Sequence, residues 1–436
     1  MSINELKKKI CDAIENRSKD IIEVGNTIWK KPELGFKEFE TSKYVRKKFD
    51  ELGLECETDV AITGVIAKMS QKLKPTIAVY GELDAIICPT HPNADPVTGA
   101  AHACGHNGQI ATMLGVGMGF LDTGILRNLS GGLMLMAVPA EEYLEIEYRL
   151  GLREQGKIKF LGGKQEFIRL GKFDDVDIVL HTHIRAPMPE RKVVFDKSYN
   201  GFLGKSVRYI GKEAHAGSAP EKGINALNAA LLGLMGIHAQ RETFKEEDTI
   251  RIHPIITKGG DMVNNVPADV RIETYVRGKT IEAIMDANKK VNRALRAGAM
   301  AVGAEVEITE IPGYMPCIND PPLVDLMRNN AAALIGKENI VEGEHRTGST
   351  DVGDLSCIMP TAGVSVGGVI GNGHSRDLKI IDPYTTYVLP AKIIAMTIID
   401  LLSNNATKAK EIISIFKPRI PRGKYLEYWD KLLTSS

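Results

Sequence analysis

Hydrophobic residues recur at three- or four-residue steps near the start of the chain, a spacing typical of an amphipathic helix. It predicts a helix over residues 3–28, ended by Lys30-Lys31-Pro32, and a second helix over 40–52. Short apolar runs then alternate with helical segments. Predicted strands cover 64–68, 76–80, 133–138 and 176–180, and predicted helices cover 107–122, 163–171 and 220–238. Buried runs of this length between helices favour an α/β fold with a largely parallel sheet.

The segment 198–313 has a different pattern. Its predicted elements are strand 205–210, helix 222–238, strands 251–256 and 270–276, helix 280–301 and strand 305–310. The order βαββαβ is that of a ferredoxin-like module. We therefore expect an α/β domain made of residues 1–197 and 314–436, interrupted by an inserted domain over 198–313.

Composition excludes several function classes. The 55 Lys and Arg residues balance the 55 Asp and Glu residues, unlike the basic surface of a general nucleic-acid binder. Apolar stretches such as 393–402 fall short of the about 20 residues that cross a bilayer. The charged N-terminus lacks the features of a signal peptide. Six scattered cysteines without a CxxC pair are typical of reduced thiols. We expect a soluble cytoplasmic protein with no nucleic-acid or membrane partner.

Polar residues follow three of the predicted strands. These strands lead into Gly81-Glu82-Leu83-Asp84, Pro139-Ala140-Glu141-Glu142 and His181-Thr182-His183. Ligands of an open α/β sheet bind beyond the carboxyl ends of its strands, so these groups are expected to share one crevice. A lone Glu-Glu pair is usually a solvated surface feature, but three coincident strand ends favour a functional site.

The segment His102-Ala103-Cys104-Gly105-His106-Asn107 has metal-ligand character. Cys104 and His106 are two residues apart, so both side chains leave the same side of an extended turn. Gly105 relieves crowding between them, and Asn107 is placed to N-cap the helix that follows. A thiolate and an imidazole on one loop begin a zinc- or manganese-type site. A buried thiol beside a core histidine is the alternative.

Motifs extend over nearly the whole chain. In order they are PELGF (32–36), GELDA (81–85), HACGHN (102–107), PAEE (139–142), VDIVLHTH (176–183), GKEAHAGSAP (211–220), GGDMVNNVP (259–267), YVRG (275–278), GSTDVGDLS (348–356) and GNGHS (371–375). Together they resemble the M20 metallopeptidase/amidohydrolase family. The likeness is to its branch of N-acyl-amino-acid amidohydrolases, hippurate hydrolases and p-aminobenzoyl-glutamate hydrolases.

The resemblance implies a metallohydrolase with an inserted ferredoxin-like domain that serves as a lid and in dimerisation. It implies two divalent ions per subunit, Zn²⁺ or Mn²⁺ or else Co²⁺. Their implied ligands are Cys104, His106, Glu142, His183 and His374. Glu141 would be the general base, and Asp84 would orient a ligand. His215 would reach a partner subunit's active site and stabilise the oxyanion, which implies a homodimer. Asn265 and Arg277 would hold the substrate's carboxylate.

The implied reaction is metal-dependent hydrolysis of the amide bond of an N-acyl or aminobenzoyl-type amino acid. A dipeptidase or aminopeptidase acting on short peptides stays open. A thiol enzyme with Cys104 as nucleophile leaves the glutamates, His183 and His374 unexplained. An inactive binding protein on this scaffold would lack a ligand or the base, and none is missing.

Two positions depart from the pattern of many family members, which carry Asp and His where this chain has Asn107 and Gln109. Asn107 and the stretch 162–177 favour the p-aminobenzoyl-glutamate branch. The glycine run 115–119 lies inside a predicted helix instead of at a strand-to-helix turn, so it does not indicate dinucleotide binding.

Overall fold

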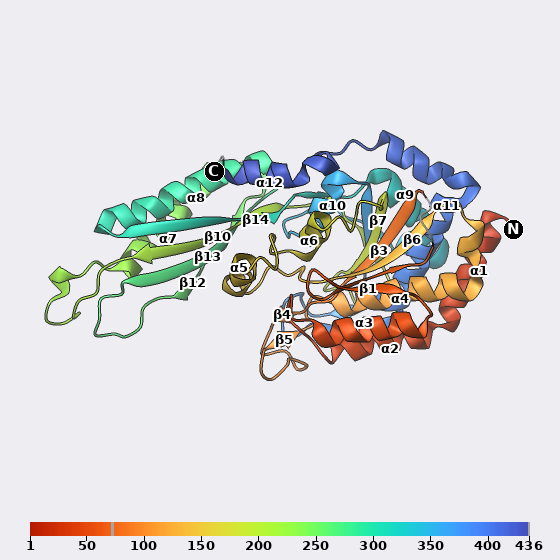
Figure 1. Ribbon diagram of the computed structural model, residues 1–436, viewed down its shortest axis with the longest axis horizontal. Helices are drawn as coiled ribbons and strands as arrows, with labels where there is room; N and C mark the ends of the chain where they lie inside the picture. The colour runs from red at the N-terminus through yellow and green to blue at the C-terminus, as the bar shows by residue number, and fades with distance from the viewer. Residues whose placement is uncertain (71–73, 435–436) are drawn as a thin grey trace. The chain divides into compact units, whose positions relative to one another are not determined.

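The computed structural model describes residues 1–70 and 74–434, which form two compact units (Figure 1). Unit 1 consists of Met1–Ser198, Ile318–His345 and Asp354–Arg422, and unit 2 of Tyr199–Cys317, Arg346–Gly353 and the chain from Gly423 onward. Unit 2 includes most of the segment 198–313, for which the sequence predicts an inserted domain. Two later segments, which the local sequence pattern does not single out, also belong to unit 2.

Unit 1 is built on an eight-stranded sheet. In sheet order its strands are β1 (Cys56–Val60), β2 (Gly64–Lys68), β6 (Gly132–Val138), β3 (Thr76–Glu82), β7 (Ile178–Ile184), β18 (Thr361–Val366), β8 (Val193–Phe195) and β16 (Ile340–Glu342). The central strands β6, β3, β7 and β18 are parallel. The β1–β2, β2–β6 and β18–β8 pairs are antiparallel.

The α/β class is therefore confirmed, but the expectation of a largely parallel sheet is wrong at both flanks. A buried apolar run has the same pattern in either strand direction, so the sequence could not distinguish the two. Strand β7 also begins and ends later than predicted, so His181 and His183 lie within it instead of following it.

The helices of unit 1 are α1 (Ile3–Asn16), α2 (Ser18–Trp29), α3 (Phe39–Glu51), α4 (His106–Thr123), α5 (Ile146–Glu154), α6 (Gly163–Arg169), α9 (Pro321–Ile335), α10 (Val352–Ile358, which crosses the unit boundary) and α11 (Leu389–Ile415). Several of them, including α3, α4, α9 and α11, pack on this sheet. Figure 1 shows α1, α2, α3 and α4 on the same side of the sheet. Helix α4 packs along β3, β6 and β7 and is covered by α1, α2 and α11. The glycine run 115–119 lies inside α4, against these neighbours.

The predicted helix over 3–28 is in fact two helices that break at Arg17. Arg17 ends α1 with φ −92° and ψ 4°. Its guanidinium donates to Asp20 (3.0 Å) and to Asp122 on α4 (2.7 Å). The apolar pattern is interrupted at this residue, and the ion pairs of Arg17 stabilise the boundary between the two helices.

One segment of unit 1, Tyr384–Ile415, is long and apolar enough to cross a membrane. However, 94% of its apolar window is buried inside the protein, so it is a core helix. It begins with a π-helical turn, Tyr384–Val388, and continues as α11, whose backbone is non-helical from Ser403 to Ala406.

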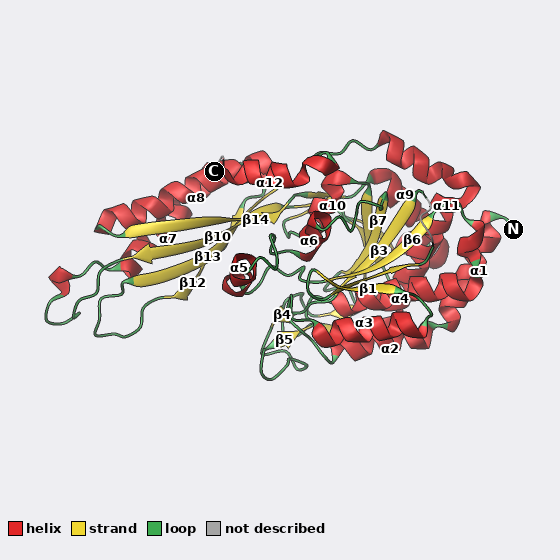
Figure 2. Ribbon diagram, in the orientation of Figure 1, coloured by secondary structure: helices red, strands yellow, loops and turns green. Residues whose placement is uncertain are grey.

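Unit 2 has a five-stranded antiparallel sheet flanked by two helices (Figure 2). Its elements are β10 (Gly201–Ile210), α7 (Ala226–Ala239), β11 (Arg251–Ile252), β12 (Ile255–Lys258), β13 (Asp269–Gly278), α8 (Ile281–Val302), β14 (Glu305–Tyr314) and the C-terminal α12 (Tyr425–Thr434). Alternate residues of β13 are buried, as expected of a strand with one face against α7 and α8.

The remaining strands are short and lie outside the two large sheets. They are β4 (Ile86–Ile87), which pairs with β5 (Ala100–Ala101), and β19 (Val369–Ile370), which pairs with β20 (Lys379–Ile380). Where the chain passes from one unit to the other lie β9 (Ser198–Tyr199), β15 (Cys317–Ile318) and β17 (His345–Arg346).

Candidate metal centre

The loop before α4 carries Cys104, and α4 begins at His106. Between them Gly105 has φ +84°, and a Cβ at this position would lie 2.6 Å from the side chain of Ile184 on β7. Glycine is therefore required for the loop to approach the end of β7. As a result, the Cys104 Sγ lies 3.5 Å from the Nε2 of His183, which β7 carries.

The loop after β6 carries the two glutamates. Ala140, just before them, has a left-handed backbone (φ +53°), and its N–H donates to the buried Glu38 carboxylate at 2.8 Å. The Glu142 N–H donates to the Asp84 carboxylate at 2.8 Å. Two buried carboxylates thus fix the backbone that presents Glu141 and Glu142, both of which are 8% exposed.

His374 reaches the same place from the loop between β19 and β20. Its backbone is also left-handed (φ +59°), and its N–H donates to the carbonyl oxygen of Ala103 at 2.8 Å. That bond anchors the His374 loop to the Cys104 loop. The His374 Nε2 lies 3.1 Å from the Glu142 Oε1.

Both ring nitrogens of the fully buried His106 face acceptors. Its Nδ1 lies 2.9 Å from the Asp84 carbonyl oxygen and 3.1 Å from the Asp84 Oδ1. Its Nε2 lies 3.1 Å from the Glu82 Oε2 and 3.9 Å from the Glu141 Oε2, and it has no hydrogen-bond partner among the described residues. A neutral imidazole donates from one nitrogen only, so with Nδ1–H donating to Asp84 the Nε2 lone pair is available to a cation.

These side chains form groups that suit metal ions. Two triads share the thiol: Cys104, His106 and His183 form one, and Cys104, Glu142 and His374 form the other. Within each triad the ligand atoms lie within 4.8 Å of one another. Zinc ligands at bond lengths of about 2.0–2.3 Å in a tetrahedron are about 3.2–3.6 Å apart, which agrees with the 3.5 Å Cys104–His183 distance. The residues therefore fit two divalent ions that share the Cys104 sulfur.

Nearby charges favour the ionised form of the Cys104 thiol, which is the form that binds metal. Burial and Glu142 oppose ionisation of the thiol, but His106 and His183 outweigh them and lower the pKa of Cys104 to about 6. Burial disfavours the charged imidazoles, yet the Cys104 thiolate keeps the pKa of both His106 and His183 above the ordinary value. Protons on these rings thus supply the positive charge that a metal ion would bring.

The carboxylates are held ionised in the same way. Burial raises the pKa of Glu142, but His374 and His106 lower it to about 2. In turn, Glu142 and Cys104 raise the pKa of His374 well above its ordinary value. The centre therefore presents a thiolate and a carboxylate to cations.

The other three predicted residues lie in unit 2. His215 and Asn265 form an antiparallel bridge. His215 is exposed, and its Nδ1 accepts from the N–H groups of Gly217 and Ser218 at 3.1 Å. Arg277 lies on β13, with its guanidinium 5.4 Å from the Phe202 ring centroid. Unit 1 thus brings together the implied ligands with Glu141 and Asp84, and unit 2 brings His215 beside Asn265.

The expectation that Asn107 caps α4 is wrong. Gly105 occupies the N-cap position without a side-chain bond. Asn107 is buried and donates to the carbonyl oxygen of Gly25 at 3.0 Å and to the Tyr387 hydroxyl at 2.8 Å. The other departure, Gln109, donates to the Glu82 Oε2 at 2.6 Å. Asn107 therefore joins α4 to its neighbours, while Gln109 faces the metal centre.

No sequence pattern indicates the acidic side chain of Glu38 near the site, and the strand-end pattern places Glu82 in the expected crevice without assigning it a role. A third group of potential ligands consists of Glu82, His106 and Glu141. The sequence indicated the position of Glu82, because this residue follows a predicted strand. Two histidines from the motifs stay outside the groups: burial lowers the pKa of both His102 and His181 to about 3, as expected of neutral core residues.

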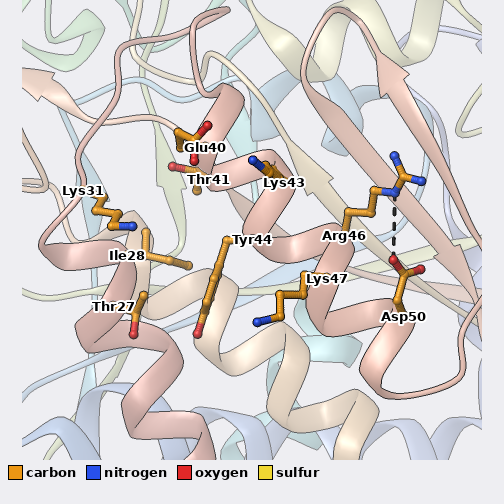
Figure 3. Close-up of a pocket in the computed structure, with 10 residues that line it drawn as sticks. All are labelled: Thr27, Ile28, Lys31, Glu40, Thr41, Lys43, Tyr44, Arg46, Lys47 and Asp50. Atoms are coloured by element: carbon orange, nitrogen blue, oxygen red, sulfur yellow. Dashed lines mark ion pairs between the residues drawn. The ribbon is translucent and has the colours of Figure 1, made fainter.

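A hollow of about 450 Å³ lies on the surface between α2 and α3 (Figure 3). Its lining is mainly basic and polar, and Arg46 is paired with Asp50 at 4.0 Å. None of its lining residues belongs to the two triads. This hollow is therefore separate from the candidate metal centre.

Comparison with known proteins gives consistent findings. Residues 78–395 match the model of peptidase family M20/M25/M40. The Xaa-Arg dipeptidase of Mus musculus is 26% identical over 98% of this chain and 93% of its own length. The IAA-amino acid hydrolase ILR1-like 4 of Arabidopsis thaliana is 25% identical over 76% of this chain and 73% of its own. The Bacillus subtilis YXEP protein, described as a dinuclear metal binding peptidase from M20 family, has the same fold, with a TM-score of 0.65 and 22% identity over 89% of this chain and 99% of its own.

Proposed function

Because this chain belongs to peptidase family M20/M25/M40 and is a hydrolase of amide bonds, we propose that it cleaves the amide of an N-acyl or aminobenzoyl-type amino acid with two divalent metal ions. The observation that carries this proposal is the pair of triads that share Cys104, with the Glu141 carboxylate 3.9 Å from the His106 Nε2.

The chain's own residues divide the work. Cys104, His106 and His183 would hold one ion, and Cys104, Glu142 and His374 the other. Two divalent ions at such a site lower the pKa of a water and polarise the scissile carbonyl. Glu141 faces the same nitrogen of His106 and takes the proton of the attacking water. It then returns that proton to the nitrogen of the leaving amine as the C–N bond breaks.

Adjacent glutamates can serve these separate roles because of their backbone. Glu142 pairs with His374, while Glu141 points toward the His106 Nε2. The hydrogen bond from Glu142 N–H to Asp84, and the one from Ala140 N–H to Glu38, hold both orientations. A base held in place before substrate arrives loses little reorganisation energy in the transition state.

We assign the second unit to substrate binding and dimerisation. The exposed His215 would stabilise the oxyanion in the active site of a partner subunit, and Asn265 and Arg277 would hold the substrate carboxylate, for which the planar guanidinium is suited. His215→Ala should be inactive alone. Mixed with inactive Glu141→Gln subunits it should regain activity, because a hybrid dimer contains one intact composite site. Hybrids that form without regaining activity would contradict the sharing.

A second substrate class is supported by one specific observation. The Xaa-Arg dipeptidase of Mus musculus is similar over 98% of this chain, so dipeptides with a free carboxylate are candidates beside N-acyl amino acids. Both classes present an amide next to a carboxylate. We place the enzyme in the cytoplasm, because its six cysteines form no disulfide in the described chain, which is typical of a reducing compartment.

The test is metal-dependent hydrolysis. The protein is stripped with a chelator, reloaded with Zn²⁺, Mn²⁺ or Co²⁺, and assayed against hippurate, p-aminobenzoyl-glutamate, N-acetyl amino acids and Xaa-Arg dipeptides. Glu141→Gln, prepared identically, controls for contaminating hydrolases. Cleavage that disappears on stripping and returns on reloading supports the proposal, and the preferred class names the substrate. Failure to bind any of the three metals would overturn it.

A further inference from the structure

A buried carboxylate that this mechanism does not use lies beside the metal centre. Glu82 ends β3 and is 2% exposed. Its Oε2 lies 3.1 Å from the His106 Nε2, the nitrogen without a hydrogen-bond partner in the described chain. With His106 and Glu141 it completes a third group of potential ligands.

The backbone brings Glu82 to this position through a close contact between β3 and α4. A Cβ on Gly81 would lie 2.7 Å from the backbone nitrogen of Ile110 in α4, a distance that no side chain tolerates. Glycine at 81 therefore lets the strand lie directly on the first turn of the helix. That turn carries both His106 and Gln109, and the Gln109 Nε2 donates to the Glu82 Oε2 at 2.6 Å.

The other oxygen of Glu82 is held by a lysine. The Lys164 Nζ is fully buried, lies 2.6 Å from the Glu82 Oε1 and sits 4.5 Å from the Tyr80 ring centroid. Lys164 thus fixes the Oε1 side, so that Oε2 faces His106.

The close approach of the His106 Nε2 and the Glu82 Oε2 requires a proton or a metal ion between these two atoms. When the Nδ1 of His106 donates to Asp84, the Nε2 and the Glu82 Oε2 both present lone pairs, and lone pairs 3.1 Å apart repel unless a proton or metal ion joins them. Nitrogen and oxygen ligands of one tetrahedral ion are about 3.3 Å apart. The observed separation therefore suits two donors of the same ion.

We propose that Glu82 is an additional ligand of the ion that His106 binds, a role that rests on the proposed two-metal function. This ion then receives a negatively charged oxygen in addition to the Cys104 thiolate. Lys164 and Gln109 act as positioning residues, since each holds one oxygen of the carboxylate.

Cobalt titration provides a test that does not depend on activity. Stripped Glu82→Gln protein should bind one of two Co²⁺ ions about 10- to 100-fold more weakly than wild type, a loss typical of altered metal-site partners. Its visible absorption should also change, because a neutral amide replaces a carboxylate. The matched control is Glu310→Gln in unit 2, where a second buried lysine, Lys205, lies 2.7 Å from a glutamate. This control should bind both ions as wild type does.

Folding is controlled in the same experiment. Glu82→Gln leaves Lys164 buried without its partner, so the double variant Glu82→Gln/Lys164→Met, which removes both charges, is measured alongside it. Its control is Glu310→Gln/Lys205→Met. Wild-type affinity and absorption in a folded Glu82 variant would overturn the inference and leave the proposed function intact. A wild-type protein that binds no cobalt would overturn both.

Discussion

Both units bury a lysine against a glutamate, but the two pairs have different surroundings. In unit 2 the Glu310 Oε1 accepts from Lys205 at 2.7 Å, from Asn288 at 2.8 Å and from Asn292 at 2.7 Å. Lys205 also donates to the Asn292 Oδ1 at 2.7 Å. Three donors thus meet on one oxygen of Glu310, and this network joins α8 to the sheet and serves stability.

In unit 1 the corresponding network continues into the metal centre. Lys164 holds one oxygen of Glu82, and Gln109 holds the other. That second oxygen also faces the His106 Nε2, an atom without a hydrogen-bond partner in the described residues. A buried charge pair thus indicates function where its carboxylate also meets a potential metal ligand, as Glu82 does and, among the described residues, Glu310 does not.

The largest effect is expected from replacing Cys104, whose sulfur belongs to both triads. Cys104→Ala removes a ligand from each ion, so metal content should fall from two ions per subunit toward none and activity should be lost. Elemental analysis after dialysis measures this. Cys357→Ala, at a buried cysteine outside the triads, should keep both ions. A Cys104→Ala protein with two tightly held ions would remove Cys104 from the ligand set.

Glu141→Gln should have the next largest effect. Loss of a general base typically reduces turnover by about 10²–10⁴-fold. Metal content should be unchanged, because Glu141 belongs to neither of the Cys104 triads. Steady-state kinetics on the fully loaded protein measure kcat, with Glu145→Gln, whose carboxylate pairs with Lys37, as the control. Near-normal kcat would refute the role of Glu141.

Much of this candidate site could be predicted from the sequence, because most of its potential ligands lie near the ends of strands or on one short motif. The spacing of Cys104 and His106, and the positions of Glu142 and His183 after or within apolar runs, place them at one edge of the sheet. The apolar pattern likewise locates β10, α7, β13, α8 and β14 to within a few residues, but the predicted strand 251–256 is two short strands, and α12 was not predicted. These features depend on residues close together in the chain, so the sequence alone can predict them.

The features that sequence could not give depend on distant contacts. Arg17 breaks the first helix where it pairs with Asp122 on α4. Asn107 turns inward because Tyr387, 280 positions later, offers a partner. Glu82, on β3, is held in place by Lys164, which lies on α6. Such partners are set by tertiary packing, and the residues carry no local sign of them.

In unit 2, breaking the lysine–glutamate pair should affect stability alone. Lys205→Met removes the cation that faces the buried Glu310 carboxylate, and removal of one partner from a buried ion pair typically costs about 3–5 kcal/mol. Denaturant unfolding measures the free energy of unfolding, and metal content serves as the control that should not change. A cost below about 1 kcal/mol would be that of an exposed pair and would contradict the stabilising role of this buried pair.

The smallest expected effect is that of pH on metal affinity. The pKa of Cys104 is lowered to about 6, so at neutral pH the sulfur is already a thiolate. The pKa values of His106 and His183 are raised above the ordinary value, so both rings must lose protons when metal binds. Apparent affinity should therefore rise with pH above 7, with proton release visible by calorimetry in buffers of different ionisation enthalpy. Affinity independent of pH between 7 and 9 would contradict the raised histidine pKa values.

The central claim, that two ions share the Cys104 sulfur, has a direct spectroscopic test. Stripped wild-type protein is titrated with Co²⁺ while the thiolate-to-cobalt charge-transfer absorption is followed. If both ions bind the same sulfur, this absorption should grow until two equivalents have been added, and Cys104→Ala should abolish it. Absorption that is complete at one equivalent, or that survives in Cys104→Ala, would contradict the shared thiolate.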